Sequence, residues 1–362
     1  MKQTCLVTGA SGFIGRHLLA SLTREGHPVL ALLRQPAQLP ALQAEVTRLG
    51  GVGTGVAALA GDLRSAGLGL NAADRARTRD VAAVFHLGAH FAWRLSAAQA
   101  RAVNVAGALQ VAELALSAEA RLVMVGGFML HNLAHLQRLG VDLQQPDASD
   151  WSRVYRRSGG YEGSKIEAHF AVRQRLQARG AALTCVHPAT LCGHSRSGHI
   201  LPGQPLAGLI DNLAHGRLSL IPGSPQHWLP LVCVDFLAEL LRLAAFDPSQ
   251  AGGELLALDA RTPNLARLID WLAQALQVRA PRRHLPIGLL RTLLRLPGLP
   301  ALLHSEPESL DFIQTRRFDT SPTQDFAARH GLPWPDLESA VRASALHLFP
   351  PVAARAALRD AG

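Results

Sequence analysis

A glycine-rich segment at residues 8–15, Thr-Gly-Ala-Ser-Gly-Phe-Ile-Gly, constrains the fold more than any other part of the chain. It follows an apolar run at residues 5–7 that is typical of a buried strand, and it precedes residues 16–22, where apolar side chains recur with helical spacing. Glycines at such a turn let the backbone approach a pyrophosphate, and the helix that follows offers free N–H groups and a favourable dipole. We therefore expect a dinucleotide site here. The residues expected to contact the dinucleotide are Gly9, Gly12, Phe13, Ile14 and Gly15.

Short apolar segments alternate with helical segments through the first half of the chain. Helices are expected at about 36–49, 97–116 and 161–179. The further segments expected to be buried strands are 29–33, 56–60, 81–85, 122–125 and 183–186. This alternation predicts an α/β fold of the Rossmann type, with a doubly wound parallel sheet covered by helices on both faces.

The pattern changes after Pro188. Proline and glycine are frequent between His194 and Pro230, so this part is predicted to be loop-rich. A strand at 231–234, a helix from Asp235 to about Phe246 and a strand at 254–258 come next, and a helix is predicted to start at Thr262-Pro263. We expect a dinucleotide-binding domain at residues 1–190, to which 231–258 return. A smaller C-terminal substrate lobe is expected from 191–230 and 259–362.

The apolar segment at residues 285–297 contains two arginines and begins and ends near a proline. Its prolines make it a poor continuous amphipathic helix. We expect it to form a lid or a wall of the substrate lobe, and contact with a membrane surface is the alternative.

Composition narrows the remaining classes. The formal charge is +9, but the arginines are spread along the chain without a basic run interleaved with aromatics, so we expect an anionic cofactor and no nucleic acid. No uninterrupted apolar run reaches the length of a membrane span, and the N-terminus leads directly into the first strand, so no signal peptide is expected. The 4 cysteines lack metal-ligand spacing. These features predict a cytoplasmic protein with reduced cysteines and no metal site.

The residue that follows the second strand indicates which nicotinamide cofactor is bound. An acidic residue there accepts a hydrogen bond from the ribose 2′-hydroxyl of NAD, whereas an arginine favours the 2′-phosphate of NADP. The position holds Arg34, and we therefore expect NADP(H). Asp62 and Leu63 follow the third strand and are expected beside the adenine ring, with a helix N-cap as the alternative role for Asp62.

Tyr161 and Lys165 are four residues apart and therefore share one face of the predicted helix. An ammonium beside a phenol stabilises the phenolate, so we expect Lys165 to lower the pKa of Tyr161 and to hydrogen-bond the nicotinamide ribose. Tyr161 is then the expected general acid or base.

At this point the chain resembles the extended short-chain dehydrogenase/reductase family, which includes NAD-dependent epimerases and dehydratases. The resemblance is carried by the octapeptide at 8–15 and the pair Tyr161 and Lys165, and it is supported by the segments 61–63, 86–89, 104–107, 187–190 and 234–238. It implies a Rossmann-type domain with a smaller substrate lobe, a nicotinamide cofactor, and often a homodimer formed through two long helices. By the same resemblance Tyr161 and Lys165 would be catalytic, and Gly88, Ala89 and Pro188 would line the cofactor.

Two departures from the family pattern bear on activity. Family members usually carry a serine or threonine just after the fifth strand, where this chain has Gly126-Gly127. Loss of one such donor can reduce the rate by about 100-fold or more. Sugar-nucleotide members carry an Arg-Asp pair where this chain has Leu229-Pro230. With the apolar residues 128–130 beside the expected nicotinamide, this predicts a hydrophobic carbonyl or alcohol as substrate.

Two alternative functions stay open, and one possible metal site is set aside. A sugar-nucleotide epimerase or dehydratase is the rival enzyme, and a redox sensor that binds NADP(H) without turnover is the rival of another class. His131 and His135 have helical spacing that could chelate a metal, but no third ligand is evident, and structural roles are favoured.

Overall fold

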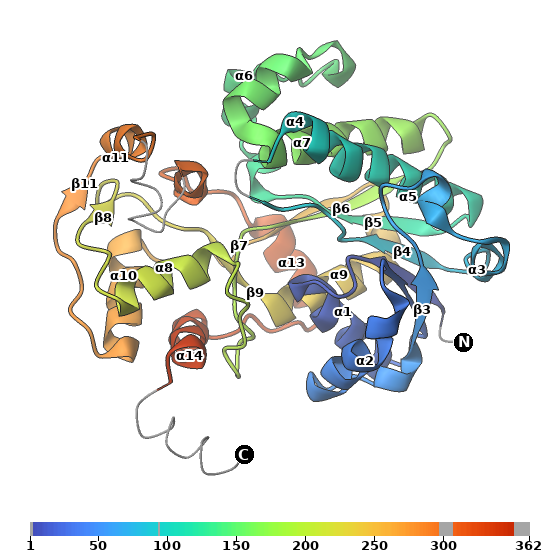
Figure 1. The fold of residues 1–362 in the computed structure, drawn as a ribbon, viewed down its shortest axis with the longest axis horizontal. Coiled ribbons are helices and arrows are strands. Elements are labelled where there is room, and N and C mark those ends of the chain that lie inside the picture. The colour runs from blue at the N-terminus through green and yellow to red at the C-terminus, as the bar shows by residue number, and fades with distance from the viewer. Residues whose placement is uncertain (1–2, 93–94, 297–306, 351–362) are drawn as a thin grey trace. The chain divides into compact units, whose positions relative to one another are not determined.

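The computed structural model describes residues 3–92, 95–296 and 307–350 (Figure 1). The chain divides into two compact units. Unit 1 comprises residues 1–188 and 237–257, and unit 2 comprises residues 189–236 and 258–362. The chain therefore returns to unit 1 at residue 237, whereas the sequence analysis expects this return at residue 231.

Unit 1 is built on a seven-stranded sheet in the spatial order β10-β6-β5-β4-β1-β2-β3, and every neighbouring pair is parallel. The strands are β1 (Cys5–Thr8), β2 (Val29–Leu33), β3 (Val56–Ala60), β4 (Ala83–His86), β5 (Arg121–Val125), β6 (Leu183–Pro188) and β10 (Glu254–Ala257). The strands alternate with helices along the chain, and this confirms the predicted Rossmann-type fold.

Helices cover both faces of this sheet (Figure 1). Alanine and valine side chains of α5 (Ala106–Ser117) and α7 (Trp151–Gln177) pack in one core cluster with leucines of the central strands. The α1 helix (Phe13–Arg24) and α2 (Leu39–Arg48) pack together on the opposite face, where Ser21 accepts a hydrogen bond from Arg242 of α9 (Val234–Phe246). Small residues on α5 and α7 let these helices lie close to the sheet.

The chain also contains several short helices and helical turns. Unit 1 also holds α3 (Ala72–Arg77), α4 (Ala97–Ala100) and α6 (Leu133–Leu139). The short turns are η1 (Pro36–Gln38), η2 (Gly53–Gly55), η3 (Ala66–Gly69), η4 (Arg101–Val105), η5 (Phe128–His131), η6 (Pro146–Ala148), η7 (Pro248–Gln250) and η8 (Pro307–Phe312).

Two helices of unit 1 differ from the sequence prediction. The helix expected at 97–116 consists of α4, a π-helical turn at η4, and α5. The helix expected at 161–179 begins at Trp151, and its backbone is broken at Gly159, which has a φ of +79°. Only glycine adopts this conformation without strain, so the glycine separates the segment that carries Tyr161 from the turns before it.

Unit 2 contains two short parallel strand pairs and five helices within the described residues. Strand β7 (Thr190–Cys192) pairs with β9 (Leu231–Cys233), and β8 (Ile221–Pro222) pairs with β11 (His284–Leu285). The helices are α8 (Pro205–Ala214), α10 (Leu265–Leu276), α11 (Ile287–Leu293), α13 (Ser321–Arg329) and α14 (Leu337–Leu348).

Two predictions for unit 2 are corrected. The stretch predicted to be loop-rich contains α8, because Leu206, Ile210 and Leu213 form a buried apolar face at helical spacing. The N-cap of α10 is Asn264, whose side chain accepts a hydrogen bond from the backbone of Arg267, and not Thr262.

The segment predicted as a lid, 285–297, contains α11, and its last residue lies outside the described part of the chain. Among the described residues, no helix combines the length and apolar character needed to cross a bilayer.

Candidate functional site

The predicted cofactor residues follow the carboxyl ends of parallel strands. Gly9 follows β1, Arg34 follows β2, and Asp62 comes two residues after β3. Gly88 lies two residues beyond β4, and Pro188 is the last residue of β6. Because the strands are parallel, these ends share one edge of the sheet, which is where open α/β sheets bind their ligands.

The turn after β1 is packed so closely that its glycines cannot be replaced. Gly9 has a φ of +68°, and a Cβ built on it would lie 2.7 Å from the backbone nitrogen of Gly88. A Cβ on Gly15 would lie 2.2 Å from the carbonyl oxygen of Gly9. Both clashes are with backbone atoms, which cannot rotate away. The turn is therefore specified by glycine at these positions, as a backbone phosphate cradle requires.

The N-terminus of α1 is left free to bind an anion. Its N-cap residue, Gly12, has no side chain, and no acidic residue lies in the first turn. Phe13 is buried and anchors the first turn, while Gly12 is exposed. No side chain caps the first turn of the helix, and no acidic side chain offsets its dipole. This arrangement fits a dinucleotide pyrophosphate.

Hydrogen bonds join the glycine-rich turn to the loop after β4. The backbone N–H of Gly88 donates to Oγ1 of Thr8 at 3.2 Å, and Thr8 is hydrogen-bonded to Nδ1 of His86 at 2.8 Å. Burial lowers the pKa of His86 to about 3, so its imidazole is neutral. Leu63 packs against Gly88, where a Cβ would lie 2.7 Å from its Cδ1 atom. The structure thus brings Leu63 and Gly88 together, while Ala89 is exposed.

The end of the sheet expected to hold the adenosine carries two arginines. The Arg34 side chain is exposed, so a phosphate could reach it from solvent. Asp62 accepts hydrogen bonds from Nε and Nη2 of Arg64, the latter at 2.6 Å, and from the backbone of Arg64. Arg64, with a smaller contribution from Arg34, lowers the pKa of Asp62 to about 2.

Asp62 is therefore a partner of Arg64 and does not cap α3, whose N-cap is Asn71. Sequence analysis missed Arg64, although its position two residues after Asp62 places it at the same sheet edge.

The segment of α7 that carries the expected catalytic pair is positioned by close contact with the preceding loop. A Cβ on Gly160 would lie 2.1 Å from the carbonyl oxygen of Leu95. Tyr161 packs edge-on against Phe91, with 4.7 Å between the ring centroids. The ammonium group of Lys165, one turn further on, donates to the carbonyl oxygen of Val125 at the end of β5. Tyr161 and Lys165 therefore face the carboxyl end of the sheet.

The protonation of this pair differs from the expectation. Burial, reinforced by the neighbouring Glu162 carboxylate, raises the pKa of Tyr161 to about 12. Burial also lowers the pKa of Lys165 to about 8. The prediction that Lys165 lowers the pKa of Tyr161 is wrong for this arrangement, because Lys165 is directed to Val125. A phenol with this pKa stays protonated at neutral pH and can donate a proton.

Asn104 links the loop at residues 88–90 to α7. It is buried within the π-helical turn η4, and its amide nitrogen donates to Oγ of Ser164 at 2.8 Å. Its amide oxygen accepts from the backbone N–H of His90 at 2.7 Å. A π turn widens the helix locally, and such turns are frequent at functional sites. Here it directs Asn104 between the 88–90 loop and α7.

The position of the usual catalytic hydroxyl is filled by other side chains. A Cβ on Gly127 would lie 2.4 Å from Sδ of Met129, and a Cβ on Gly126 would lie 2.2 Å from Nδ1 of His187. Gly127 has an extended backbone with a φ of −166°, so its conformation does not require glycine. Sequence analysis placed Met129 among the apolar residues beside the nicotinamide. It did not predict that Met129 and His187 fill these two spaces, because no local pattern reveals what lies beside a glycine.

The histidines considered in the sequence separate into two environments. His135, in α6, is bonded to Glu162 through Nε2 at 2.6 Å. His131 ends η5 and lies against His187, with 5.0 Å between the ring centroids. The two are therefore not a helical chelating pair, but His131 and His187 belong to a buried cluster that sequence analysis did not predict.

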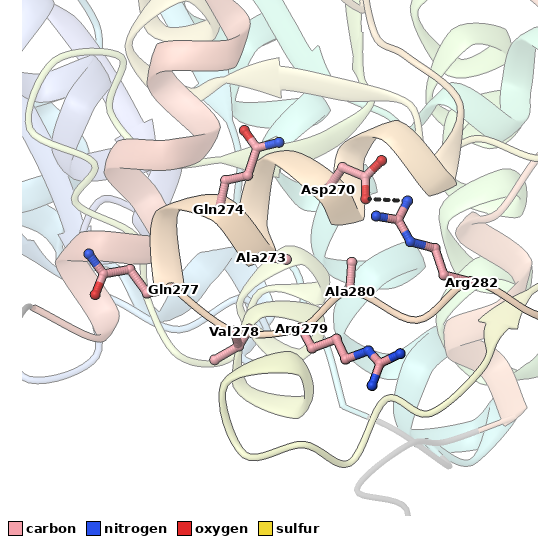
Figure 2. A pocket seen from close by; sticks show the side chains of 8 residues that line it. All are labelled: Asp270, Ala273, Gln274, Gln277, Val278, Arg279, Ala280 and Arg282. Carbon is pink, nitrogen blue, oxygen red and sulfur yellow. Dashed lines mark hydrogen bonds and ion pairs between the residues drawn. The ribbon is translucent and has the colours of Figure 1, made fainter.

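A surface hollow in unit 2 contains none of the predicted site residues. Arg282 pairs with Asp270 across one side of it at 3.4 Å. Its lining is Asp270, Ala273, Gln274, Gln277, Val278, Arg279, Ala280 and Arg282, all from the end of α10 and the loop after it (Figure 2). The hollow is therefore not part of the candidate site.

Comparisons with curated proteins find two relatives. The chain is 32% identical over 212 residues to the PKS-NRPS hybrid synthetase cheA of Chaetomium globosum, which is 56% of this chain but only 4% of that protein. It is 25% identical over 297 residues to sterol demethylase protein B of Methylococcus capsulatus, covering 80% of this chain and 79% of that protein. The chain thus spans a small part of the first relative and most of the second.

Solved structures share the fold at low identity. The terminal R domain of the myxalamid PKS-NRPS pathway has a TM-score of 0.76 at 20% identity, covering 97% of this chain and 92% of that one. Yeast methylglyoxal/isovaleraldehyde reductase Gre2, solved with NADPH, has a TM-score of 0.66 at 16% identity, covering 96% and 98%. The family described as male sterility protein, NAD_binding_4, matches residues 7–241. This match covers most of the chain, and the chain therefore belongs to that family, within the extended short-chain dehydrogenases/reductases.

Proposed function

We propose that this protein is an NADP(H)-dependent reductase that converts an apolar carbonyl compound to the alcohol, with Tyr161 as the proton donor. The observation that carries the proposal is the placement of Tyr161 one helical turn from Lys165, at the carboxyl edge of a sheet whose glycine turn and uncapped α1 fit a dinucleotide. The reduced nicotinamide supplies the hydride to the carbonyl carbon. Tyr161 gives its proton to the carbonyl oxygen, which leaves a phenolate that is reprotonated from solvent.

Lys165 has a supporting role in this proposal. Its buried ammonium group is held by the carbonyl of Val125 and lies on the same face of α7 as Tyr161. The same ammonium group can reach the nicotinamide ribose, as the resemblance implies. Loss of Lys165 should therefore weaken both cofactor binding and turnover.

The charges at the β2 and β3 ends support NADP(H) over NAD(H). Arg34 stands where an acidic residue would bind the ribose 2′-hydroxyl, and its guanidinium is exposed. Arg64 adds a second guanidinium, and the Asp62 carboxylate is already engaged by it. A 2′-phosphate would be held here by charge-assisted hydrogen bonds, which are stronger than neutral ones.

Apolar residues near the expected nicotinamide support an apolar substrate. Met129 fills the space beside Gly127, and the neighbouring Phe128 and Leu130 are buried. The Arg-Asp pair of sugar-nucleotide members is replaced by Leu229-Pro230. The relatives' names include a sterol demethylase protein and a PKS-NRPS synthetase, and we therefore propose a lipid-like carbonyl, either a sterol ketone or an acyl chain.

The proposal includes a cytoplasmic location and a homodimer formed through α5 and α7. Sedimentation of the purified protein would give twice the mass of the chain if the dimer forms.

Oxidation of NADPH, with product identification by mass spectrometry, tests the reductase. The substrates are a keto sterol, a long-chain aldehyde and a long-chain acyl thioester, each run with NADH in parallel. Reduction of the thioester would release the thiol and give the aldehyde, which a second NADPH would reduce to the alcohol. We expect turnover with at least one and faster turnover with NADPH. Purification with bound oxidised cofactor and binding of a nucleoside diphosphate sugar would replace the proposal with an epimerase. Absence of turnover together with NADPH-dependent binding of a protein partner would replace it with a sensor.

A further inference from the structure

Four side chains of the kinds that bind transition metals meet inside unit 1. They are His169 on α7, Cys185 and His187 on β6, and Glu254 on β10. One ligand atom from each of His169, Cys185 and His187 lies within 4.8 Å of the other two, and all three residues are buried. A second set, His131, His187 and Glu254, meets the same distance condition and shares His187 with the first.

The local structure explains why these residues converge. Cys185 and His187 alternate along β6 and therefore point to the same face of the sheet. Glu254 is the direct neighbour of Cys185 in the β10–β6 register. His169 lies one helical turn after Lys165, on the side of α7 that faces β6. The cluster is thus fixed by rigid elements and not by a loop.

Glu254 lies beside both imidazoles and is hydrogen-bonded to that of His187. The Nε2 atom of His187 lies 3.1 Å from one carboxylate oxygen of Glu254, and Nε2 of His169 lies 3.7 Å from the other. Arg173, a further turn along α7, pairs with the same carboxylate and holds it in place. Metal-binding histidines commonly donate their second N–H group to a carboxylate in this way.

The Nδ1 atoms of the two imidazoles lie in different environments. The Nδ1 atom of His187 is buried and has no hydrogen-bond partner among the described residues, and the side chain is 0% exposed. A buried unsatisfied nitrogen of this kind is costly in a folded protein and needs an explanation. The Nδ1 atom of His169 lies 3.6 Å from Sγ of Cys185. Nε2 of His131, in contact with the His187 ring, is also buried and without a partner in the described part of the chain.

The charges around the cluster are suited to a dication only if Cys185 is ionised. Lys165 and Arg173 are positive charges near Cys185. A bound metal displaces the thiol proton. The thiolate and Glu254 then offset the two charges of the metal.

We propose that His169, Cys185 and His187 bind one divalent zinc-class cation through one nitrogen of each imidazole and the sulfur of Cys185, with the Glu254 carboxylate beside them. Nitrogen and sulfur ligands in a buried set are typical of zinc sites. The metal would join β6 and α7. Access is through Glu254 and His131, which are partly exposed.

Cobalt(II), which replaces zinc and reports its ligands by colour, is the probe. Tag-free protein is dialysed against a chelator, freed of the chelator, and titrated with Co²⁺ while visible and near-ultraviolet absorption are recorded. We expect one tightly bound equivalent, a thiolate-to-cobalt charge-transfer band and a higher melting temperature, because a ligand that binds only the folded state stabilises it.

Three variants locate the metal. Cys185→Ser should lose the charge-transfer band and bind at least about 10-fold more weakly. Glu254→Gln should keep the band but bind about 10–100-fold more weakly, as expected for a residue that orients ligands. Cys5→Ser, a buried thiol on β1 outside the cluster, should titrate like the unchanged protein.

Melting curves without metal verify that each variant folds. The proposal is overturned if the unchanged protein binds no stoichiometric cobalt, or if it binds several weak equivalents without the band. It is also overturned if folded Cys185→Ser binds cobalt as tightly and with the same spectrum.

Discussion

The imidazole of His187 fills the space into which a side chain on Gly126 would project. A Cβ on Gly126 would lie 2.2 Å from Nδ1 and 2.6 Å from Cε1 of this fully buried ring. Met129 does the same beside Gly127. Two consecutive glycines thus admit two large side chains where family members carry a hydroxyl. The absent hydroxyl is therefore part of a packed arrangement, and its restoration has different consequences at the two positions.

Replacement by alanine should destabilise the protein more at Gly126, whose neighbouring side chain is rigid, than at Gly127, whose neighbouring side chain is flexible. In Gly126→Ala the new Cβ meets a buried ring with little room to move, so we expect a loss of about 1–3 kcal/mol in the free energy of unfolding. In Gly127→Ala it meets the end of a flexible thioether, and the loss should be under about 1 kcal/mol. Urea unfolding of both variants measures the difference. Equal losses would show that His187 does not hold its position.

Gly127→Ser should increase a weak reductase activity, since it supplies a donor near the carbonyl oxygen. The increase should be larger with Met129→Ala, which removes the side chain that occupies the space of the hydroxyl. One such donor is worth about 100-fold or more in turnover in other enzymes, which sets the upper range. The Gly127→Ala variant is the control for backbone and packing effects. Equal kcat values for the serine and alanine variants would exclude a role for the hydroxyl.

Buried neutral histidines should make the protein sensitive to acid. The pKa values of His86 and His169 are about 3 in the folded chain and near the ordinary 6.5 when unfolded. Below about pH 6.5 these histidines become protonated in the unfolded chain, whereas in the folded chain they stay neutral down to about pH 3. Each of these histidines lowers the free energy of unfolding by about 1.4 kcal/mol per pH unit in that window.

Urea unfolding between pH 7.5 and 4.5, with chelator present, measures this slope. His169→Gln should reduce this slope by about one proton. The low pKa of Asp62 affects stability only below about pH 4. A free energy of unfolding that is constant from pH 6.5 to 4.5 would contradict the buried neutral state.

Arg34→Ala should weaken NADPH binding while leaving NADH binding nearly unchanged. Hydrogen bonds to charged groups contribute about 1.5–3 kcal/mol, which corresponds to about 10–100-fold in Kd. Arg64→Ala should also favour NADH, because it leaves the Asp62 carboxylate unpaired near the phosphate. Arg48→Ala, an exposed arginine paired with Glu45 on α2, is the matched control. Calorimetric titration of each protein gives its affinities for NADPH and NADH, and an unchanged NADPH preference in the first two variants would exclude this cofactor assignment.

The fold could be predicted from sequence because its signals are local. The strand at 29–33 has the predicted bounds, since five consecutive apolar residues can only be buried on both faces of a parallel sheet. The glycine turn was equally predictable, because it combines a strand, glycines and a helix within one short segment. The broken start of α7 was not, since the adjoining Gly160 packs against the loop at Leu95, which is distant in sequence.

The site could be predicted only where one element carries the whole pattern. Tyr161 and Lys165 share a helix face, and His169 and Arg173 continue that face at the same spacing, which was the available sign of the second cluster. The direction of the Lys165 ammonium toward Val125, and hence the protonation of Tyr161, depends on how β5 packs against α7. Contacts between distant segments of this kind, including the one between His187 and Gly126, require the three-dimensional structure.

Tyr161→Phe tests the proposed mechanism most directly, because the chain contains only 2 tyrosines and the other, Tyr155, provides a matched control. Phenylalanine keeps the ring that packs on Phe91 and removes only the proton donor. With a carbonyl substrate that the unchanged protein reduces, single-turnover NADPH oxidation should fall by about 100- to 10,000-fold while NADPH affinity stays within about twofold. Tyr155→Phe, which loses a hydrogen bond to Glu167, should keep the rate. A Tyr161→Phe protein that oxidises NADPH at the unchanged rate would contradict the assignment of Tyr161 as proton donor.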